Sequence, residues 1–133
     1  MCSLRRKGVN EFKKTKGPKL LKKNTQIESL FNFKCKLTHN MQVFCFSWHR
    51  NNKDILAVGY GGYGHVDRDK YAIGMVLFWS LCNPSFPEKH FHTSFGVIAL
   101  EFTETKPGLL AVGMYNSSIA IYDTSGRNTQ DLH

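Results

Sequence analysis

The sequence lacks any apolar run close to the roughly 20 residues that a membrane-spanning helix needs. Its first residues, Met1–Lys7, are charged and lead into no apolar stretch of the kind found in secretory signals. A C-x-x-C pair is also missing, because Cys2, Cys35, Cys45 and Cys82 are widely spaced. We therefore predict an intracellular protein without a transmembrane segment or a cysteine zinc site.

Acidic residues are scarce at the N-terminus. Nine of the 18 Lys and Arg residues lie in residues 1–24 beside a single acid, Glu11, and the rest of the chain is electrically balanced. We predict a disordered basic tail over 1–24 that is attracted to polyanions. Its one aromatic residue, Phe12, argues against nucleic acid, since single-strand binders stack bases on aromatic side chains. The candidate polyanion-binding cations are Arg5, Arg6, Lys7, Lys13, Lys14, Lys22 and Lys23.

Helical periodicity is absent, and short alternating segments take its place. Residues Phe31–Leu37 alternate strictly between apolar and polar side chains, which predicts a half-buried strand. Turn residues separate it from further short segments rich in Val, Ile and aromatic residues, which predicts an all-β fold. The other expected strands are Val43–Trp48, Ile55–Tyr60, Ile73–Leu81, Lys89–Thr93, Val97–Phe102, Leu109–Met114 and Ser118–Asp123.

The strongest signal is an internal repeat. Residues 43–60 align with 97–114 at an offset of 54, and both copies contain Leu-Ala-Val-Gly. Val76–Ser80 then matches Ile119–Asp123 at an offset of 43. Such a repeat predicts β-propeller blades over about 43–93 and 97–123, within a partial WD-repeat propeller spanning 25–123 and followed by a polar tail, 124–133. The shared glycine is expected where strands crowd together. The alternative is a sandwich of two unrelated hairpins.

Several motifs resemble one family. Residues 54–61, 74–81, 109–115 and 119–122 match, in order and spacing, the first blades of axonemal dynein intermediate chains, a WD-repeat family. The connector Asn-Pro-Ser-Phe-Pro-Glu, residues 83–88, adds a feature that generic WD repeats lack.

The resemblance implies a non-catalytic scaffold subunit that docks on a dynein heavy chain, beside other intermediate and light chains, and supports ciliary and flagellar motility. It implies a place in the cytoplasm, the cytoskeleton and the axoneme, and makes the microtubule surface the natural polyanion for the basic tail. The family has a long N-terminal region and a full ring of blades, and this chain carries two blades. We therefore expect a fragment or a truncated product, in which Phe31–Leu37 is the strand that would close the ring. A generic WD-repeat adaptor outside the axoneme is the alternative.

Two sequence patterns are of the kind found in nucleotide-binding or metal-binding sites. Gly59–Val66 fits the glycine-rich loop of protein kinases, but Gly74 stands where the kinase lysine would follow. His90 and His92 form an H-x-H pair, a spacing more typical of a solvent-facing strand than of a zinc site. We therefore predict no catalytic, cofactor-binding or metal-binding residues.

Propellers bind partners through loops and rims, so we expect protein contacts at loop and connector positions. These are Tyr60, Tyr63, Asn83, Pro84, Phe86, Pro87, Tyr115 and Asn116.

Overall fold

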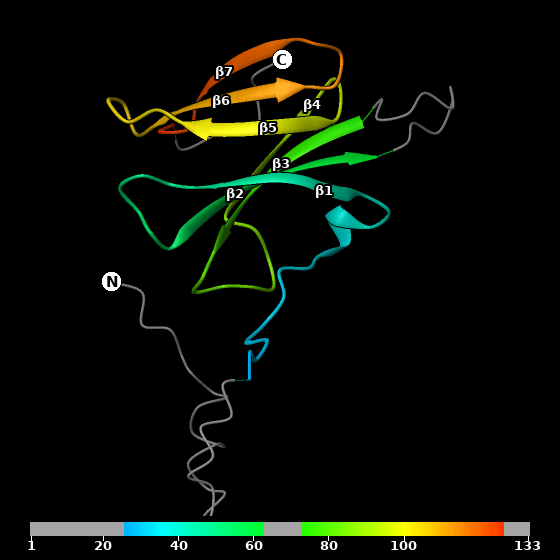
Figure 1. Ribbon diagram of the computed structural model, residues 1–133, viewed down its shortest axis with the longest axis vertical. Helices are drawn as coiled ribbons and strands as arrows, with labels where there is room; N and C mark the ends of the chain where they lie inside the picture. Colours follow the sequence, from blue (N-terminus) through cyan, green and yellow to red (C-terminus); the bar gives the residue numbers. More distant parts are fainter. Residues whose placement is uncertain (1–25, 63–72, 127–133) are drawn as a thin grey trace, which may run out of the picture.

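The computed structural model describes residues 26–62 and 73–126, and within these ranges the fold is all-β, as predicted (Figure 1). A short 3-10 helix, η1 (Lys36–Thr38), precedes the strands. No helix of the described ranges is long and apolar enough to cross a membrane. The strands are β1 (Gln42–Trp48), β2 (Ile55–Gly62), β3 (Ile73–Ser80), β4 (Lys89–Thr93), β5 (Val97–Phe102), β6 (Leu109–Met114) and β7 (Ile119–Asp123).

The strands form two antiparallel sheets in chain order. The first sheet has the order β1-β2-β3-β4 and the second has the order β5-β6-β7. The second sheet lies over one face of the first, and β1 and β5 run side by side along their shared edge (Figure 1). Seven of the eight expected strands are therefore present, with ends within two residues of the predicted ones.

The strand registers confirm the internal repeat residue by residue. In the first sheet Phe46 lies opposite Val58, and in the second sheet Leu100 lies opposite Val112, each 54 positions later. Both first strands also carry a bulge at the same place, between Val43 and Cys45 and between Val97 and Ala99. Because a bulge re-aims a strand locally, its repetition shows that the two sheets are copies of one unit.

Each sheet has two different faces. We call the face of a sheet that points toward the next sheet in the chain its forward face, and the opposite one its rear face. The rear face of the second sheet packs on the forward face of the first, and this contact holds the larger core cluster. Its buried members are Ala57, Val76, Phe78, Val97, Leu100, Phe102, Leu110, Val112 and Met114.

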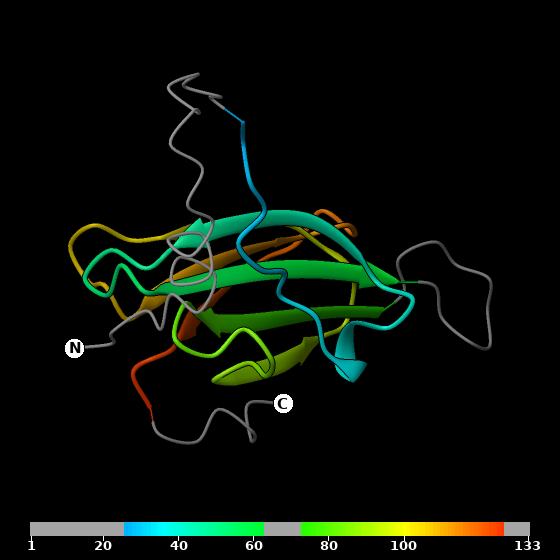
Figure 2. The same cartoon turned by 90° about the horizontal axis from the view of Figure 1, so that it is seen from below.

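Part of the rear face of the first sheet is covered by side chains from residues 26–41, which we call the covering segment. Phe33, Cys35 and Leu37 pack there against a second cluster that includes Leu77 and Trp79. Figure 2 shows the covering segment crossing the strands of the first sheet. Phe33 and Trp79 are in ring contact, with centroids 5.1 Å apart.

The predicted strand over Phe31–Leu37 is wrong. The backbone there pairs with no neighbouring strand, and at Lys36 it enters η1, where Thr38 donates both its N–H and its hydroxyl to the carbonyl of Cys35. The alternation of side chains is nevertheless real, because Phe33, Cys35 and Leu37 face the sheet while Lys34 is exposed. One-sided burial, without a hydrogen-bonded ladder, is enough to produce a period of two.

The predicted tail over 1–24 lies outside the described residues, as do the loop residues 63–72 and the last seven positions. Of the three described cysteines, Cys35 and Cys45 are free thiols, and both are half-buried. Cys82 is disulfide-bonded.

The shared glycine of the repeat meets a different neighbour in each copy. A Cβ at Gly59 would lie 2.5 Å from Cγ1 of Val97 and 2.6 Å from Sγ of Cys45. At the matching Gly113, the nearest atom is Cβ of Ala99 at 3.2 Å, since no further sheet covers that face among the described residues. The expected crowding is thus confirmed, and it is tighter where the two sheets meet.

We expect Gly59→Ala to lower the free energy of unfolding by about 1–3 kcal/mol, because overpacking forces the second sheet away from the first. Gly113→Ala is the matched control and should cost less than about 1 kcal/mol. Urea denaturation followed by circular dichroism measures both. Equal costs at the two positions would contradict the tighter crowding at Gly59.

Candidate interaction surface

The connections between strands gather at two ends of the sheets. One end, which we call the turn end, holds the β1–β2 turn (49–54), the β3–β4 connector (81–88) and the β5–β6 turn (103–108). The other end, which we call the opposite end, holds the β4–β5 turn (94–96) and the β6–β7 turn (115–118). Of the predicted contact residues, Asn83, Pro84, Phe86 and Pro87 lie at the turn end, and Tyr115 and Asn116 lie at the opposite end.

The β3–β4 connector is a folded part of the turn end. Asn83 donates its N–H to the carbonyl of Ser80 at 3.0 Å, and its Oδ1 accepts the N–H of Ser85 at 3.3 Å. Pro87 is buried, whereas the ring of Phe86 is 56% exposed. The connector therefore presents an aromatic ring to solvent from a backbone that its own hydrogen bonds hold in place.

Tyr115 and Asn116 lie at the opposite end. Tyr115 is exposed and donates its N–H to the carbonyl of Gly96 at 2.9 Å, which joins the β6–β7 turn to the β4–β5 turn. Oδ1 of Asn116 accepts the N–H of Ser118 at 3.2 Å, and Ser117 has a positive φ of 69°. Asn116 thus stabilises a tight turn, and its neighbour Tyr115 is turned outward.

Pro84 is half-buried in the connector. Tyr60 is only 4% exposed, and its hydroxyl accepts the indole N–H of Trp79 at 3.0 Å. Burial raises the pKa of Tyr60, which keeps its hydroxyl protonated at neutral pH. Its side chain therefore stabilises the rear face of the first sheet. Tyr63 lies outside the described residues.

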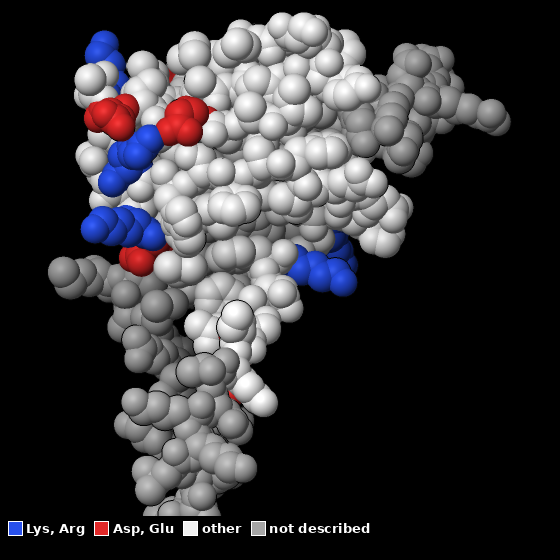
Figure 3. Space-filling view, in the orientation of Figure 1, with Lys and Arg blue, Asp and Glu red and all other residues white. Residues whose placement is uncertain are grey.

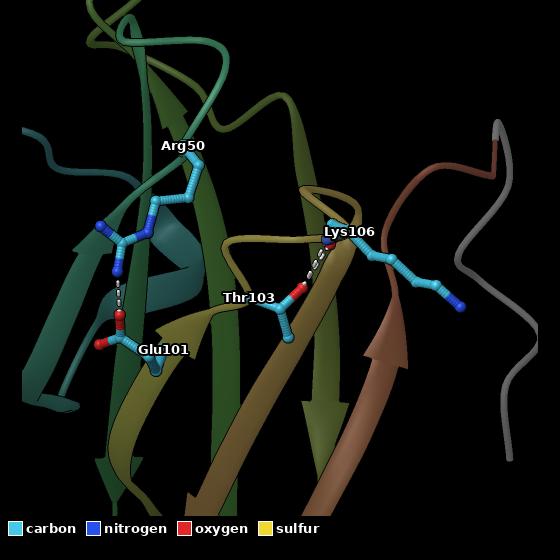
Figure 4. Close-up of polar contacts among 4 residues, drawn as sticks. All are labelled: Arg50, Glu101, Thr103 and Lys106. Atoms are coloured by element: carbon cyan, nitrogen blue, oxygen red, sulfur yellow. Dashed lines mark hydrogen bonds and ion pairs between the residues drawn. The ribbon is translucent and has the colours of Figure 1, made fainter.

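Polar side chains at the turn end join the two sheets and stabilise one of the turns. Arg50 reaches from the β1–β2 turn to the carboxylate of Glu101 on β5, and Thr103 closes the β5–β6 turn by bonding Lys106 (Figure 4). The Arg50–Glu101 pair is exposed, so it contributes at most about 1 kcal/mol. It joins the β1–β2 turn of the first sheet to β5 of the second.

A cavity of about 470 Å³ lies between the sheets at the same end. Lys89 closes one side of it by donating from Nζ to the carbonyls of Thr124 and Gly126, each at 3.0 Å. His49 and Glu88 also line it. This junction could not be predicted, because its residues come from the β1–β2 turn, the β3–β4 connector with the start of β4, and the segment after β7.

Charge gathers at the turn end. Arg50, Lys53, Glu104 and Lys106 are exposed on its turns. In Figure 3 the charged side chains lie mainly at the left, and the middle of the face in view carries none. A partner that binds across both sheets would therefore meet a charged rim beside an uncharged surface.

His49 organises the β1–β2 turn. Its Nδ1 accepts the backbone N–H groups of Asn51 and Asn52, at 3.2 and 3.0 Å, and its ring meets Phe102 of β5 edge to face at a centroid distance of 4.9 Å. Burial lowers the pKa of His49. Protonation of Nδ1 would break both hydrogen bonds, so the neutral ring holds the turn.

The lowered pKa of His49 gives stability a pH dependence. Below the ordinary histidine pKa of about 6.5, the unfolded chain binds more protons at this position than the folded chain does. Its stabilisation is therefore present above pH of about 6.5 and is lost as the pH falls toward the folded-state pKa. We expect the free energy of unfolding to decrease from pH 7.5 to pH 5.5, and the decrease to be smaller in His49→Gln. His92→Gln, at an exposed position, should keep the full dependence.

The two sequence patterns associated with metal or nucleotide chemistry lie on β4 and, in part, on β2. No group of three or more His, Cys, Asp or Glu side chains within them could hold a metal ion. His90 and His92 lie on β4 with ring centroids 6.3 Å apart. Burial raises the pKa of Cys45 to about 11, so its thiol is protonated at neutral pH. The first two glycines of the kinase-like pattern, Gly59 and Gly61, are paired with neighbouring strands in β2, where they face other side chains.

Two antiparallel sheets that repeat residue by residue and pack forward face to rear face define a pair of blades from a WD-repeat β-propeller. No family model matches the chain. The chain is 42% identical over 107 residues to dynein axonemal intermediate chain 4 of Mus musculus, which covers 80% of this chain and 12% of the mouse protein. Over this matched part the chain is homologous to axonemal dynein intermediate chains.

Other relatives agree. The chain is 44% identical over 97 residues to dynein axonemal intermediate chain 4 of Danio rerio, covering 73% of this chain and 12% of that protein. It is 36% identical over 104 residues to the 78 kDa dynein intermediate chain of the flagellar outer arm of Chlamydomonas reinhardtii, covering 78% of this chain and 15% of that protein. The chain thus spans between a tenth and a sixth of the length of these curated relatives.

Proposed function

We propose that this chain is a non-catalytic scaffold element of an axonemal dynein complex, and that its blades dock on a dynein heavy chain in cilia or flagella. The observation behind the proposal is that the match to axonemal dynein intermediate chains covers about four fifths of this chain. Sequence kinship and a repeated blade fold therefore point to the same role.

The turn end is the surface that fits this role best. It combines an ordered connector, the exposed ring of Phe86 and a rim of exposed charges around Arg50. Aromatic rings on a preformed backbone are efficient anchors, because little conformational entropy is lost when they bind. We assign the first contact with the heavy chain to Asn83 and Phe86, and a second contact to Tyr115 and Asn116 at the opposite end.

The basic tail serves a different contact in this proposal. Nine cations in residues 1–24 fit the acidic surface of a microtubule, and such binding weakens as salt is added. Cosedimentation with microtubules separates the tail from the blades. The whole chain should pellet at low salt, and a chain that starts at residue 25 should not.

A pull-down tests the heavy-chain contact. The tagged chain is incubated with a salt extract of ciliary axonemes, and the captured proteins are identified by mass spectrometry. We expect a dynein heavy chain among them, and less of it with Phe86→Ser. Ile119→Ser, at an exposed position on the second sheet, serves as the matched control. Capture of non-motor proteins without any heavy chain would favour a general WD-repeat adaptor.

A further inference from the structure

The cavity of about 470 Å³ lies where the two sheets meet at the turn end. Among the residues that line it, Phe78 and Ser80 are buried, Ile55 is half-buried, and Asn52 and Glu88 are exposed. The lining therefore runs from a polar rim to a partly apolar interior. Both sheets that bound it are present in this chain, so its walls do not depend on any further blade.

The carboxylate of Glu88 is a charge on this lining that lacks a counterpart. The backbone N–H of Glu88 donates to the carbonyl of Phe78 at 2.8 Å, which fixes the residue at the cavity. Within residues 26–62 and 73–126, however, no group bonds to its carboxylate. Arg50, a basic side chain of the same end, is already paired with Glu101 (Figure 4). Glu88 can therefore accept a cation from outside the chain.

The other ionisable groups on the lining are already engaged. Lys89 donates two of its three N–H groups to the carbonyls of Thr124 and Gly126, each at 3.0 Å. His49 adds no positive charge, because its Nδ1 accepts two backbone N–H groups and must therefore be unprotonated. The group that best complements the remaining charge is a cation placed at Glu88.

We propose that the cavity receives a basic side chain of the dynein partner, with its aliphatic stem against Phe78 and Ile55 and its charged head at Glu88. Lys and Arg suit such a site, because they bury their stems on apolar surface while their heads stay at a polar rim. Phe86 precedes Glu88 by two positions on the same connector, so a partner that covers the exposed Phe86 ring also reaches the cavity. The identity of the partner rests on the proposed function, and the chemistry of the contact goes beyond it.

A nuclear magnetic resonance titration of the full chain tests the cavity without the partner. The probe is Nα-acetyl-arginine amide, and Nα-acetyl-citrulline amide has nearly the same shape without the charge. We expect the backbone amide signals of Glu88 and Thr124 to shift with the arginine probe, with a Kd of about 1–10 mM. The citrulline probe should bind about threefold more weakly, as befits an ion pair at an exposed rim.

Glu88→Gln removes the charge and keeps the shape, so it should abolish the preference for arginine over citrulline. Because Glu88 is exposed, the variant should keep the circular dichroism spectrum of the unchanged chain. Glu104→Gln is the matched control, since Glu104 is an exposed acid of the β5–β6 turn that does not line the cavity. It should keep the full preference.

Three results of the titration would overturn the proposal. One is equal binding of the two probes, and another is a preference for arginine that survives Glu88→Gln. The third is tighter binding of Nα-acetyl-glutamate amide than of the arginine probe, because Lys89 would then be the recognising group.

A pull-down from a salt extract of ciliary axonemes tests the assignment of the cavity to the dynein partner. Glu88→Gln should recover about three- to fivefold less heavy chain than Glu104→Gln does. Equal recovery by the two variants would overturn that assignment. If the unchanged chain captures no heavy chain although the titration shows the arginine preference, the proposed function fails and the cavity remains a site for a basic side chain.

Discussion

Replacing Trp79 by alanine is expected to lower the free energy of unfolding by about 3–5 kcal/mol. Trp79 is fully buried on the rear face of the first sheet, where it donates its indole N–H to Tyr60 and packs against Phe33 of the covering segment. The substitution therefore opens a large cavity and also leaves the covering segment without its main contact. For a domain of this size such a loss is comparable to the whole stability, about 5–15 kcal/mol.

Trp48→Ala is the matched control, because it makes the same change at a tryptophan that is 45% exposed. It should cost about 1 kcal/mol or less, because nearly half of the Trp48 surface is already in solvent and its loss opens no enclosed cavity. Urea denaturation followed by far-UV circular dichroism compares the two without relying on tryptophan fluorescence. A cost at Trp48 equal to that at Trp79 would contradict the assignment of the core to the covered part of the rear face.

Gly74→Ala should be the most damaging glycine-to-alanine change among the described residues. A Cβ at this position would overlap the carbonyl oxygen of Phe95 and Oγ1 of Thr93. The hydroxyl of Thr93 donates to that same carbonyl at 2.7 Å, so the obstacle is a backbone group held in place. We expect a loss of about 3 kcal/mol or more, at the upper end of overpacking effects, because β4 and the following turn must move away from β3.

The control for this change lies one ladder position away. Gly62→Ala on β2 would meet nothing nearer than 3.6 Å, an ordinary van der Waals distance, and should change stability by less than about 1 kcal/mol. Thermal unfolding of the two variants gives the comparison. If Gly74→Ala unfolded at the temperature of the unchanged chain, the close approach of β4 to β3 would be refuted.

Much of the fold could be predicted because both copies of the repeat contain the same strand and turn patterns. Leu-Ala-Val-Gly recurs, and in both copies strands containing β-branched residues precede and follow it. The period-two pattern sets which side chains share a face. Even the bulge recurs, between Val43 and Cys45 and again between Val97 and Ala99. The strands expected from the local sequence pattern therefore agree with the observed strand pairing. Turn residues such as Asn52 indicated where the strands end.

The covering segment could not be predicted, because alternation reports burial and not hydrogen bonding. Phe33, Cys35 and Leu37 alternate with polar residues as the buried side chains of a strand do, and they pack on the first sheet. Their backbone nevertheless pairs with no strand. The burial of Tyr60 was also missed, because Tyr60 is the last residue of the predicted strand Ile55–Tyr60 and was expected to contact a partner there. In the structure β2 continues to Gly62.

The candidate surface was predictable only as a list of loop positions. Their division between two ends follows from strand direction, which places Asn83 and Phe86 beside the β1–β2 turn and Tyr115 beside Gly96. The junction formed by His49, Arg50 and Lys89 was missed, because each residue looks like an ordinary polar turn or edge residue in isolation. Only the packing of the second sheet on the first brings them together.

The central claim is that these two blades serve as docking blades of an axonemal dynein intermediate chain. The most direct test replaces the matched segment of the mouse dynein axonemal intermediate chain 4 by residues 26–126 of this chain and measures co-precipitation of a dynein heavy chain from ciliated cells. Because the matched segments are 42% identical, we expect the chimera to retain the heavy chain at a level close to that of the unchanged mouse protein. A chimera that is expressed and folded, yet recovers no heavy chain while the mouse protein does, would contradict the account.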